Sequence, residues 1–348
     1  MSHNINTYIG RQAAWHALGT VTGKYQTTEE LLSDKGFQYI VFKSQLHDGL
    51  GRPVDAWGTF RWDLADKLAG NKDAAQFLGS VGKDYTVIQH AEGFKTIDAL
   101  MGVADGAFYE TAGVLGNGEQ VWALADLGFA AKIGDDVQKG YLLFATGHDG
   151  SMAHLYKICF ERVVCANTLA IALGEKTAGK FSVRHTKNAM DRIIDARAAL
   201  ASMGEDVKRM EGRLNFLASR RLTREAVGSI FDRLFPKTKK DDGAETSSTR
   251  RENILADVLK IYEMNDGNAF PEQRGTAYNL LNAITNYVDH ERSSKEDGRA
   301  ESAMFGSGDT LKSKALETIL EVGKTLNLTR LALPEATPVF AYVPAGVK

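Results

Sequence analysis

The order in which strand-like and helix-like patterns follow one another most constrains the fold of this chain. Up to about residue 160, short β-branched and aromatic runs alternate with turn signals, such as "HDGLGRP" (47–53) and Gly-Asn-Gly (116–118). Asn-Gly and Asp-Gly favour tight hairpins, because the turn residues need positive φ. Beyond residue 185, apolar residues recur at helical spacing, as in 186–221. This order predicts an α+β fold with an antiparallel β-sheet core in the N-terminal half, backed by a long helix and followed by a helical C-terminal region.

One segment divides the chain by composition. Residues 236–250, "PKTKKDDGAETSSTR", contain no apolar side chain larger than alanine, which is typical of a flexible linker or surface loop. It separates a predicted α+β core (1–235) from a predicted helical region (251–348) that ends in an extended tail. With 348 residues, the chain is long enough for one large domain or two ordinary ones.

Several classes of protein are disfavoured by what the sequence lacks. No apolar run approaches the ~20 residues of a membrane helix, and the first residues lack the basic segment and apolar stretch of a signal peptide, so we expect neither feature. Two cysteines in a chain of 348 residues do not make a disulfide framework, so we expect a cytoplasmic protein. The phosphate-binding patterns Gly-x-Gly-x-x-Gly and Gly-x₄-Gly-Lys-Ser/Thr are missing. We therefore expect no cofactor and no nucleotide hydrolysis.

The charges are unevenly distributed along the chain. Residues 1–150 hold 12 Lys and Arg against 18 Asp and Glu, whereas residues 157–260 hold 21 against 14. A basic segment in a nearly neutral protein predicts a local anion-binding surface. Helices with ordinary solvated charges would give the same count.

Basic and aromatic residues are interleaved in "KICFERVV" (157–164) and "KTAGKFSVRHTKNAMDR" (176–192). In a strand, Ser182 and Arg184 point to one face and His185 to the other. A basic groove with stacking aromatic rings is typical of proteins that bind single-stranded nucleic acid, although a sheet edge protected from aggregation by cations has the same pattern. Phosphates would be neutralised by arginine and lysine, and bases would be stacked or hydrogen-bonded by phenylalanine or histidine. The predicted nucleic-acid-binding residues are Lys157, Arg162, Asn167, Lys180, Phe181, Arg184, His185, Lys187 and Arg192.

The tripeptide His-Asp-Gly occurs twice, at 47–49 and at 148–150. Asp-Gly alone accounts for both copies as hairpin turns. The second copy continues into Ser151 and leads to both cysteines, so it also suggests an enzyme site. The candidate catalytic residues of this alternative are His148, Asp149, Ser151 and Cys165, with His185 close by in space.

The same region contains ligand types that suit zinc, namely two imidazoles and two thiols. Their spacing does not suit a structural zinc site, which usually pairs ligands two to five residues apart on one knuckle or helix face. The gaps here hold five, four and five residues, so we expect no metal at His148, His154, Cys159 and Cys165.

Several segments that cover most of residues 10–320 carry a resemblance to a known family. They are "GRQAAWHALG", "LGSVGKDYTVIQHAEGF", "AGVLGNGEQVWALADL", "HDGSMA", "RVVCANTLAIAL", "AYNLLNAITNYVDHER" and "MFGSGDTLKSKAL". The chain resembles the phage/plasmid-like protein family, a family defined as a domain of unknown function. This resemblance implies residence on mobile elements and in bacteria, and it supplies no activity. The fold order is also similar to that of phage single-strand annealing proteins of the Red-beta and RecT type, which form rings or filaments on single-stranded DNA.

Three hypotheses follow for the function. The first is a mobile-element protein that binds and anneals single-stranded DNA in recombination or replication, as a possible homo-oligomer and without a membrane partner. The second is an enzyme with a site around 148–165. The third is an accessory protein that binds or inhibits host proteins.

Overall fold

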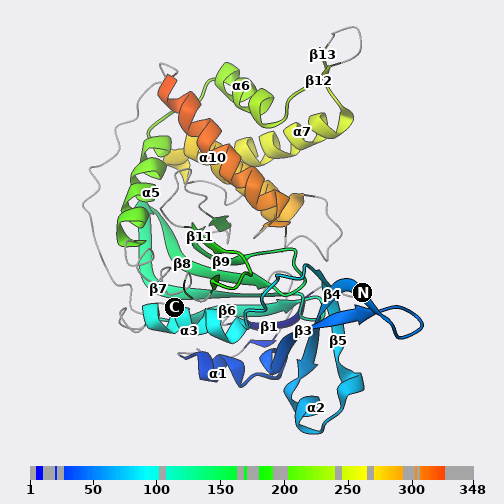
Figure 1. Ribbon diagram of the computed structural model, residues 1–348. Coiled ribbons are helices and arrows are strands. Elements are labelled where there is room, and N and C mark those ends of the chain that lie inside the picture. Colours follow the sequence, from blue (N-terminus) through cyan, green and yellow to red (C-terminus); the bar gives the residue numbers. More distant parts are fainter. Residues whose placement is uncertain are drawn as a thin grey trace. The chain divides into compact units, whose positions relative to one another are not determined.

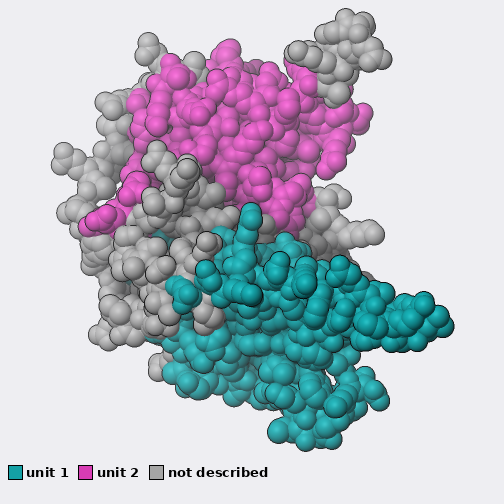
Figure 2. Space-filling view, viewed as in Figure 1, with its two compact units in different colours: residues 1–128, 141–158, 172–204 teal, residues 129–140, 159–171, 205–348 magenta. Residues whose placement is uncertain are grey.

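The computed structural model describes most of the chain, and Figure 1 shows the order of its elements. Two compact units are distinguished (Figure 2). Unit 1 comprises residues 1–128, 141–158 and 172–204, and unit 2 comprises residues 129–140, 159–171 and 205–348. The described residues are 5–10, 20–21, 27–101, 107–162, 168–170, 180–189, 191, 203–239, 245–264, 270–292, 302–303 and 306–325.

The larger of the sheets has eight strands. They follow the order β10-β9-β8-β7-β6-β1-β2, and β11 also pairs with β9. The β1–β6, β6–β7, β9–β10 and β9–β11 pairs are antiparallel, and the short β1–β2 pair is parallel. The strands are β1 (Ile5–Gly10), β2 (Thr20–Val21), β6 (Phe108–Leu115), β7 (Gln120–Ile133), β8 (Asp136–Gly147), β9 (His154–Arg162), β10 (Thr168–Ala170) and β11 (Lys180–Val183).

The hairpin between β6 and β7 forms at Gly-Asn-Gly, as predicted. Leu115 pairs with Gln120 across the turn, and both glycines have positive φ, +62° at Gly116 and +115° at Gly118. An added Cβ at Gly118 would lie 3.2 Å from both the Tyr39 hydroxyl and the Arg61 side chain. Glycine is therefore required at this turn for its backbone conformation and for the close approach of its neighbours.

A second, three-stranded antiparallel sheet of unit 1 contains the first His-Asp-Gly. Its order is β3-β4-β5, with β3 at Tyr39–His47, β4 at Pro53–Asp63 and β5 at Gln76–Val81. In the turn between β3 and β4, the Asp48 carboxylate accepts hydrogen bonds from the backbone N–H groups of Leu50 and Arg52. The first copy is thus a hairpin turn, as expected from Asp-Gly.

The core of unit 1 forms between helix α3 (His90–Met101) and aromatic side chains of the sheets and of the 3₁₀ helix that ends at Phe37. Phe94 makes edge-on contacts with Phe37, Tyr109 and Phe144, with ring centroids 5.2 to 6.1 Å apart. Such contacts add to the hydrophobic stabilisation of a buried cluster. The other helical elements of this unit are α1 (Thr28–Leu32), α2 (Leu64–Leu68), η2 (Lys35–Phe37) and η3 (Lys72–Ala74).

Unit 2 holds the C-terminal helices. Helix α6 (Arg224–Leu234) begins after Thr223, whose hydroxyl caps the helix by accepting from the Ala226 N–H. Three longer helices follow it in the described part of the chain, and the second of them continues into a π-helix at its end. The helical elements are α5 (Met203–Ala218), α6 (Arg224–Leu234), α7 (Thr249–Met264), η4 (Pro271–Gln273), α8 (Ala277–Asn286), the π-helix η5 (Tyr287–Glu291) and α10 (Ser307–Thr325).

Antiparallel sheets in the N-terminal half and helices mostly in the C-terminal half confirm the predicted α+β class. The domain division at 236–250 stays a prediction. Within it, β12 (Thr238–Lys239) pairs with β13 (Glu245–Thr246), and residues 240–244 lie outside the described part. None of the helices in the described ranges combines the length and apolar character that a membrane crossing requires.

Candidate nucleic-acid interface

The basic segment predicted from the sequence begins in strand β11. This strand pairs antiparallel with β9, and Lys180 lies opposite Lys157. After β11, the chain runs beside the segment that follows β5. The Thr86 N–H donates to the His185 carbonyl over 3.0 Å, and the His185 imidazole reaches the Thr86 carbonyl over 3.2 Å. Two segments that are about 100 residues apart in the sequence are thereby joined.

Side chains alternate along this segment as the strand pattern predicted. Ser182 and Arg184 are exposed, whereas Val183 and His185 are buried. Lys187 is exposed further along, and Lys83 is exposed on the neighbouring segment. We define the basic surface as Lys83, Arg184 and Lys187. Its cations are carried by two segments that backbone hydrogen bonds hold together.

Lysine and tryptophan side chains support the basic surface from β3 and β4. The Lys43 ammonium donates to the carbonyls of Lys83 and Tyr85, over 2.7 and 2.6 Å, and lies 5.1 Å from the centre of the Trp57 ring. A cation placed over an aromatic face is attracted by the ring quadrupole. Lys43 therefore fixes the segment that carries Lys83.

Two of the predicted nucleic-acid-binding residues are enclosed. Lys157 is 1% exposed on β9, and His185 is 6% exposed. His185 stacks on Tyr85 with ring centroids 4.7 Å apart, so its ring face is occupied by protein. Neither side chain lies on the exposed surface with Arg184 and Lys187.

The remaining predicted contacts can be placed only in part. The backbones of Arg162, Lys180 and Phe181 lie in strands β9 and β11, and their side chains are not described. Asn167 and Arg192 lie outside the described residues. Their assignment to a nucleic-acid interface stays a prediction.

The second His-Asp-Gly also forms a turn. The Asp149 carboxylate accepts from the Ser151 N–H over 3.0 Å and from the Ser151 hydroxyl over 2.6 Å. Gly150 has φ of +84°, as the turn requires. Asp149 and Ser151 are thus bonded to each other. Cys165, the predicted nucleophile, lies outside the described residues.

His148 differs from its neighbours because it points into the core of unit 1. It is 0% exposed, and its ring centroid lies 5.6 Å from that of His90 and 6.4 Å from that of Tyr39. In the same unit, the ring centroids of His154 and His185 lie 6.4 Å apart. We define the histidine cluster as His90, His148, His154 and His185. All four are buried.

Hydrogen bonds assign the proton positions of three of these imidazoles. His90 Nε2 donates to the Phe37 carbonyl over 3.1 Å, and His185 Nδ1 donates to the Thr86 carbonyl, because a carbonyl only accepts. The Tyr156 hydroxyl donates to the Gly93 carbonyl and therefore accepts from His154 Nε2. The second nitrogen of each of these rings carries a lone pair.

Several nitrogens of the cluster have no hydrogen-bond partner in the part of the chain that the structure describes. They are Nδ1 of His90, Nδ1 of His154 and both ring nitrogens of His148. Unpartnered buried polar atoms are rare in proteins and cost free energy of folding. The cluster is therefore an energetically costly feature of unit 1.

Burial determines the charge state of the cluster. Desolvation lowers the pKa of His90 to about 4 and that of His154 to about 3. Burial, together with repulsion from the other three imidazoles, holds the pKa of His148 well below its usual range. Burial also lowers the pKa of His185, against the opposing effects of the Thr86 carbonyl and Asp149. All four rings are neutral at pH 7.

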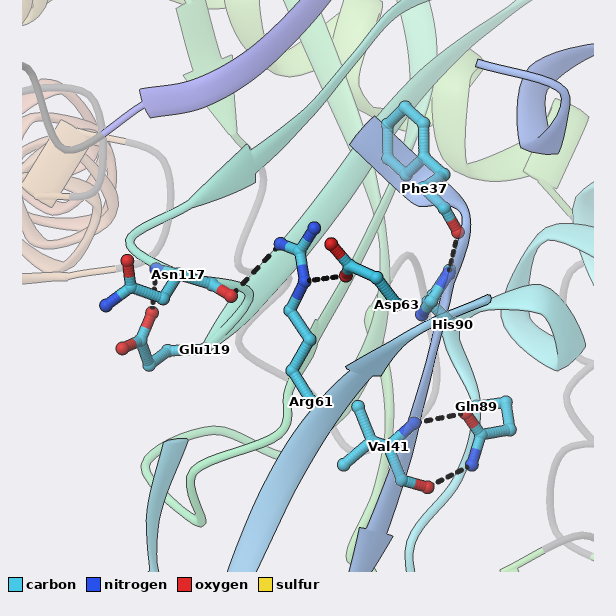
Figure 3. A network of polar contacts seen from close by, with 8 residues as sticks. All are labelled: Phe37, Val41, Arg61, Asp63, Gln89, His90, Asn117 and Glu119. Carbon is cyan, nitrogen blue, oxygen red and sulfur yellow. Dashed lines mark hydrogen bonds and ion pairs between the residues drawn. The ribbon is translucent and has the colours of Figure 1, made fainter. Parts of the chain in front are cut away.

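An arginine network lies next to the cluster (Figure 3). Arg61 donates to the Asp63 carboxylate over 2.6 Å and to the Asn117 carbonyl over 3.1 Å. Its guanidinium carbon lies 4.1 Å from the centre of the Tyr39 ring, which in turn lies 4.6 Å from that of His90. The positive charge of Arg61 adds to the lowering of the His90 pKa. No carboxylate among these contacts is bonded to a cluster imidazole.

Gln89 closes part of the free edge of strand β3. Its side-chain amide accepts from the Val41 N–H over 3.0 Å and donates to the Val41 carbonyl over 2.7 Å, as Figure 3 shows. An amide side chain can in this way replace a neighbouring strand. The next residue, His90, is thereby positioned at the start of α3.

The cluster is not arranged as a metal centre. In the described part of the chain, no three His, Cys, Asp or Glu side chains are placed to hold a metal ion. In each neutral imidazole, the ring nitrogen that carries the lone pair can instead accept a proton.

Sequence reasoning did not find His90, Tyr39 or Lys83. These residues come from segments that pattern analysis assigns to ordinary strands, turns and a helix. No spacing rule relates them to His148 or His185, because the tertiary fold brings them together. The one available signal was the second His-Asp-Gly, which contains His148; its assignment to an enzyme site stays a prediction.

Comparison with known families gives one result. Residues 77–305 match the family model described as a domain of unknown function, DUF932. Neither the curated proteins nor the solved structures include a match. The matched range includes the histidine cluster and the basic surface, and it covers more than half of the chain. The chain therefore belongs to the DUF932 family.

Proposed function

We propose that unit 1 binds single-stranded nucleic acid through the basic surface. The observation that carries this proposal is the pair of hydrogen bonds between Thr86 and His185, which places Lys83 on a segment next to Arg184 and Lys187. Cations held on a defined backbone neutralise phosphates and release counterions, which supplies most of the affinity of non-specific binding. The exposed Asp84 borders the surface, so the binding is of moderate strength.

The biological role belongs to the same proposal. The protein acts on single-stranded DNA of a mobile element, in recombination or replication, and anneals strands without hydrolysing a nucleotide. The resemblance to the phage/plasmid-like family and the fold order shared with phage annealing proteins support this role. Fold similarity supports it only by analogy.

The enzyme alternative receives less support. The hydrogen bonds between Asp149 and Ser151 account for both residues as parts of a turn, and His148 is fully enclosed. A general base must come within hydrogen-bond reach of its substrate. No contact among the described residues favours the host-protein accessory role either.

Fluorescence anisotropy with a labelled oligonucleotide across a salt series tests the proposal. For a single strand, each phosphate that a variant no longer neutralises reduces the slope of log affinity against log salt by about 0.7. We expect the double variant Arg184→Gln/Lys187→Gln to bind more weakly and to show a slope that is smaller by about 1.4.

Lys67→Gln/Lys72→Gln is the matched control. Both lysines are exposed in unit 1, on α2 and η3, and the change removes the same charge. The proposal is overturned if the wild-type protein does not bind at low salt, or if both double variants lose affinity equally.

A further inference from the structure

We propose that the histidine cluster makes nucleic-acid binding by the basic surface acid-sensitive, because protonation of the cluster releases the segment that carries Arg184 and Lys187. This inference rests on the proposed function and adds regulation to the same site. It is carried by the position of one residue, His185, which belongs to the cluster and lies between Arg184 and Lys187 of the basic surface in the sequence.

His185 is the side chain that anchors the basic segment. Its ring stacks on Tyr85 at an interplanar angle of 11°, its Nδ1 donates to the Thr86 carbonyl, and its Nε2 lies 3.5 Å from the Thr146 hydroxyl. The residues on either side of it, Arg184 and Thr186, are exposed. If the His185 ring leaves its place, the exposed cations lose their defined position.

The surroundings of the cluster offer little compensation for an added proton. Charged Arg61 on β4 is balanced by Asp63 and bonded to Asn117. Among the described residues, Asp149 is the carboxylate that favours a charged His185, and it already accepts two hydrogen bonds from Ser151. Other titratable groups near the cluster, among the described residues, include Tyr39 and Lys43 on β3, Tyr85 after β5, Asp98 on α3, Tyr109 on β6, Glu119 at the start of β7 and Tyr156 on β9.

Protonation therefore favours an opened form of the site. A second charged imidazole would repel the first, and a buried charge without a counter-ion is costly. The protonated rings are stabilised by water, which they reach when residues 146–154 and 183–187 separate locally. Opening of this kind is how buried histidines act as pH switches.

The direction in which oligonucleotide affinity changes with pH distinguishes this mechanism from the attraction between an exposed, protonated histidine and a polyanion. An exposed histidine gains positive charge in acid and strengthens the binding of a polyanion. A histidine cluster that must open before it is charged releases the segment that carries Arg184 and Lys187. The affinity for a polyanion then falls in acid. The two mechanisms predict opposite slopes in the same measurement.

The experiment measures oligonucleotide affinity from pH 7.5 to pH 5 at constant ionic strength, with a rhodamine label whose emission is insensitive to pH in this range. We expect the affinity of the wild-type protein to fall by at least about tenfold, the change in binding constant that a pKa difference of one unit between the bound and the opened form produces. His148→Leu and His148→Gln remove the enclosed ring, and we expect this fall to shrink in both. His47→Leu changes an exposed histidine of the same unit, and we expect it to retain the full fall.

Hydrogen exchange on the wild-type protein provides a second readout that does not depend on any variant. After correction for intrinsic rates, we expect amides in 146–155 and 183–189 to lose protection at pH 5, while α8 and α10 keep it. Rising affinity in acid, an unchanged fall in the His148 variants, or simultaneous loss of protection in α8 and α10 overturns the inference. Absence of binding already at pH 7.5 and low salt would instead reject the proposed function.

Discussion

Lys312 donates a 2.7 Å hydrogen bond to Asp289, and the two side chains are only 1% and 0% exposed. Lys312 lies on α10, and Asp289 lies on the π-helix η5 that ends the α8 segment. The ion pair therefore joins two helical elements inside unit 2. π-Helical turns within helices are rare and often occur where a particular side chain must be placed. Here, the π-helix brings Asp289 to Lys312.

Removal of one partner of this ion pair should destabilise unit 2 strongly. Lys312→Met leaves the Asp289 charge without its ammonium, and such changes cost about 3 to 5 kcal/mol. Lys312→Met/Asp289→Leu removes both charges and should recover part of this stability. Urea unfolding followed by circular dichroism gives the free energies.

The matched control is Lys95→Met, because Lys95 pairs with Glu92 at 3.0 Å on the exposed face of α3. Exposed pairs contribute at most about 1 kcal/mol. Equal destabilisation by Lys312→Met and Lys95→Met would contradict the interpretation of the buried pair.

Local signals made part of this fold predictable from the sequence. The hairpin at Gly-Asn-Gly and the turns at both copies of His-Asp-Gly depend on a few neighbouring residues, and these predictions match the structure. The α+β class followed from the order of the patterns. These features need no knowledge of tertiary contacts.

Features that depend on the burial of side chains by tertiary contacts could not be predicted from local sequence. Lys157 lies in a strand in which successive residues on both faces are buried, so a lysine that the pattern assigned to the surface is enclosed. The histidine cluster draws on α3, β9 and two turns, which no periodicity connects. Tertiary packing alone determines both outcomes, as it does the π-helix at Asp289.

Gly93 is expected to tolerate no larger residue. It lies on α3, and an added Cβ would come within 2.2 Å of the Phe144 ring and 2.8 Å of the His154 ring. Gly93→Ala should therefore destabilise unit 1 by about 1 to 3 kcal/mol, the usual cost of overpacking. Thermal unfolding of the variant checks this value.

Gly212→Ala provides the comparison for a helical glycine. Gly212 lies on α5, and no atom is within 4 Å of its added Cβ. Alanine is favoured over glycine in a helix by about 1 kcal/mol, so this variant should melt higher than the wild type. A melting temperature that rises for both variants would show that α3 adjusts to fill the space.

The two His-Asp-Gly turns should respond alike to removal of the aspartate. Asp48→Ala and Asp149→Ala each remove carboxylate hydrogen bonds that hold the backbone of the turn. We expect both variants to be moderately destabilised and to bind oligonucleotide normally at neutral pH. Loss of oligonucleotide binding in Asp149→Ala alone would show that the second turn takes part in binding as well as in folding.

The stability of unit 1 should decrease in mild acid because of the histidine cluster. The pKa of His90 is about 4 in the folded chain, against about 6.5 in an unfolded one. The unfolded state therefore binds more protons below pH 6.5, so the free energy of unfolding is highest above that pH. It decreases as the pH falls toward 4, and His90 alone removes about 2 kcal/mol between pH 7 and pH 5.

Urea unfolding at pH 7, 6 and 5, followed by tryptophan fluorescence, measures this decrease. Gln can donate to the Phe37 carbonyl as His90 does, but it does not titrate. His90→Gln should therefore flatten the pH dependence, whereas His47→Leu should leave it unchanged. The lowered pKa of His154, about 3, adds a decrease of the same sign. A free energy of unfolding that stays constant from pH 7 to pH 5 would mean that the imidazoles are solvated in the folded chain, and it would remove the physical basis for acid release of the basic segment.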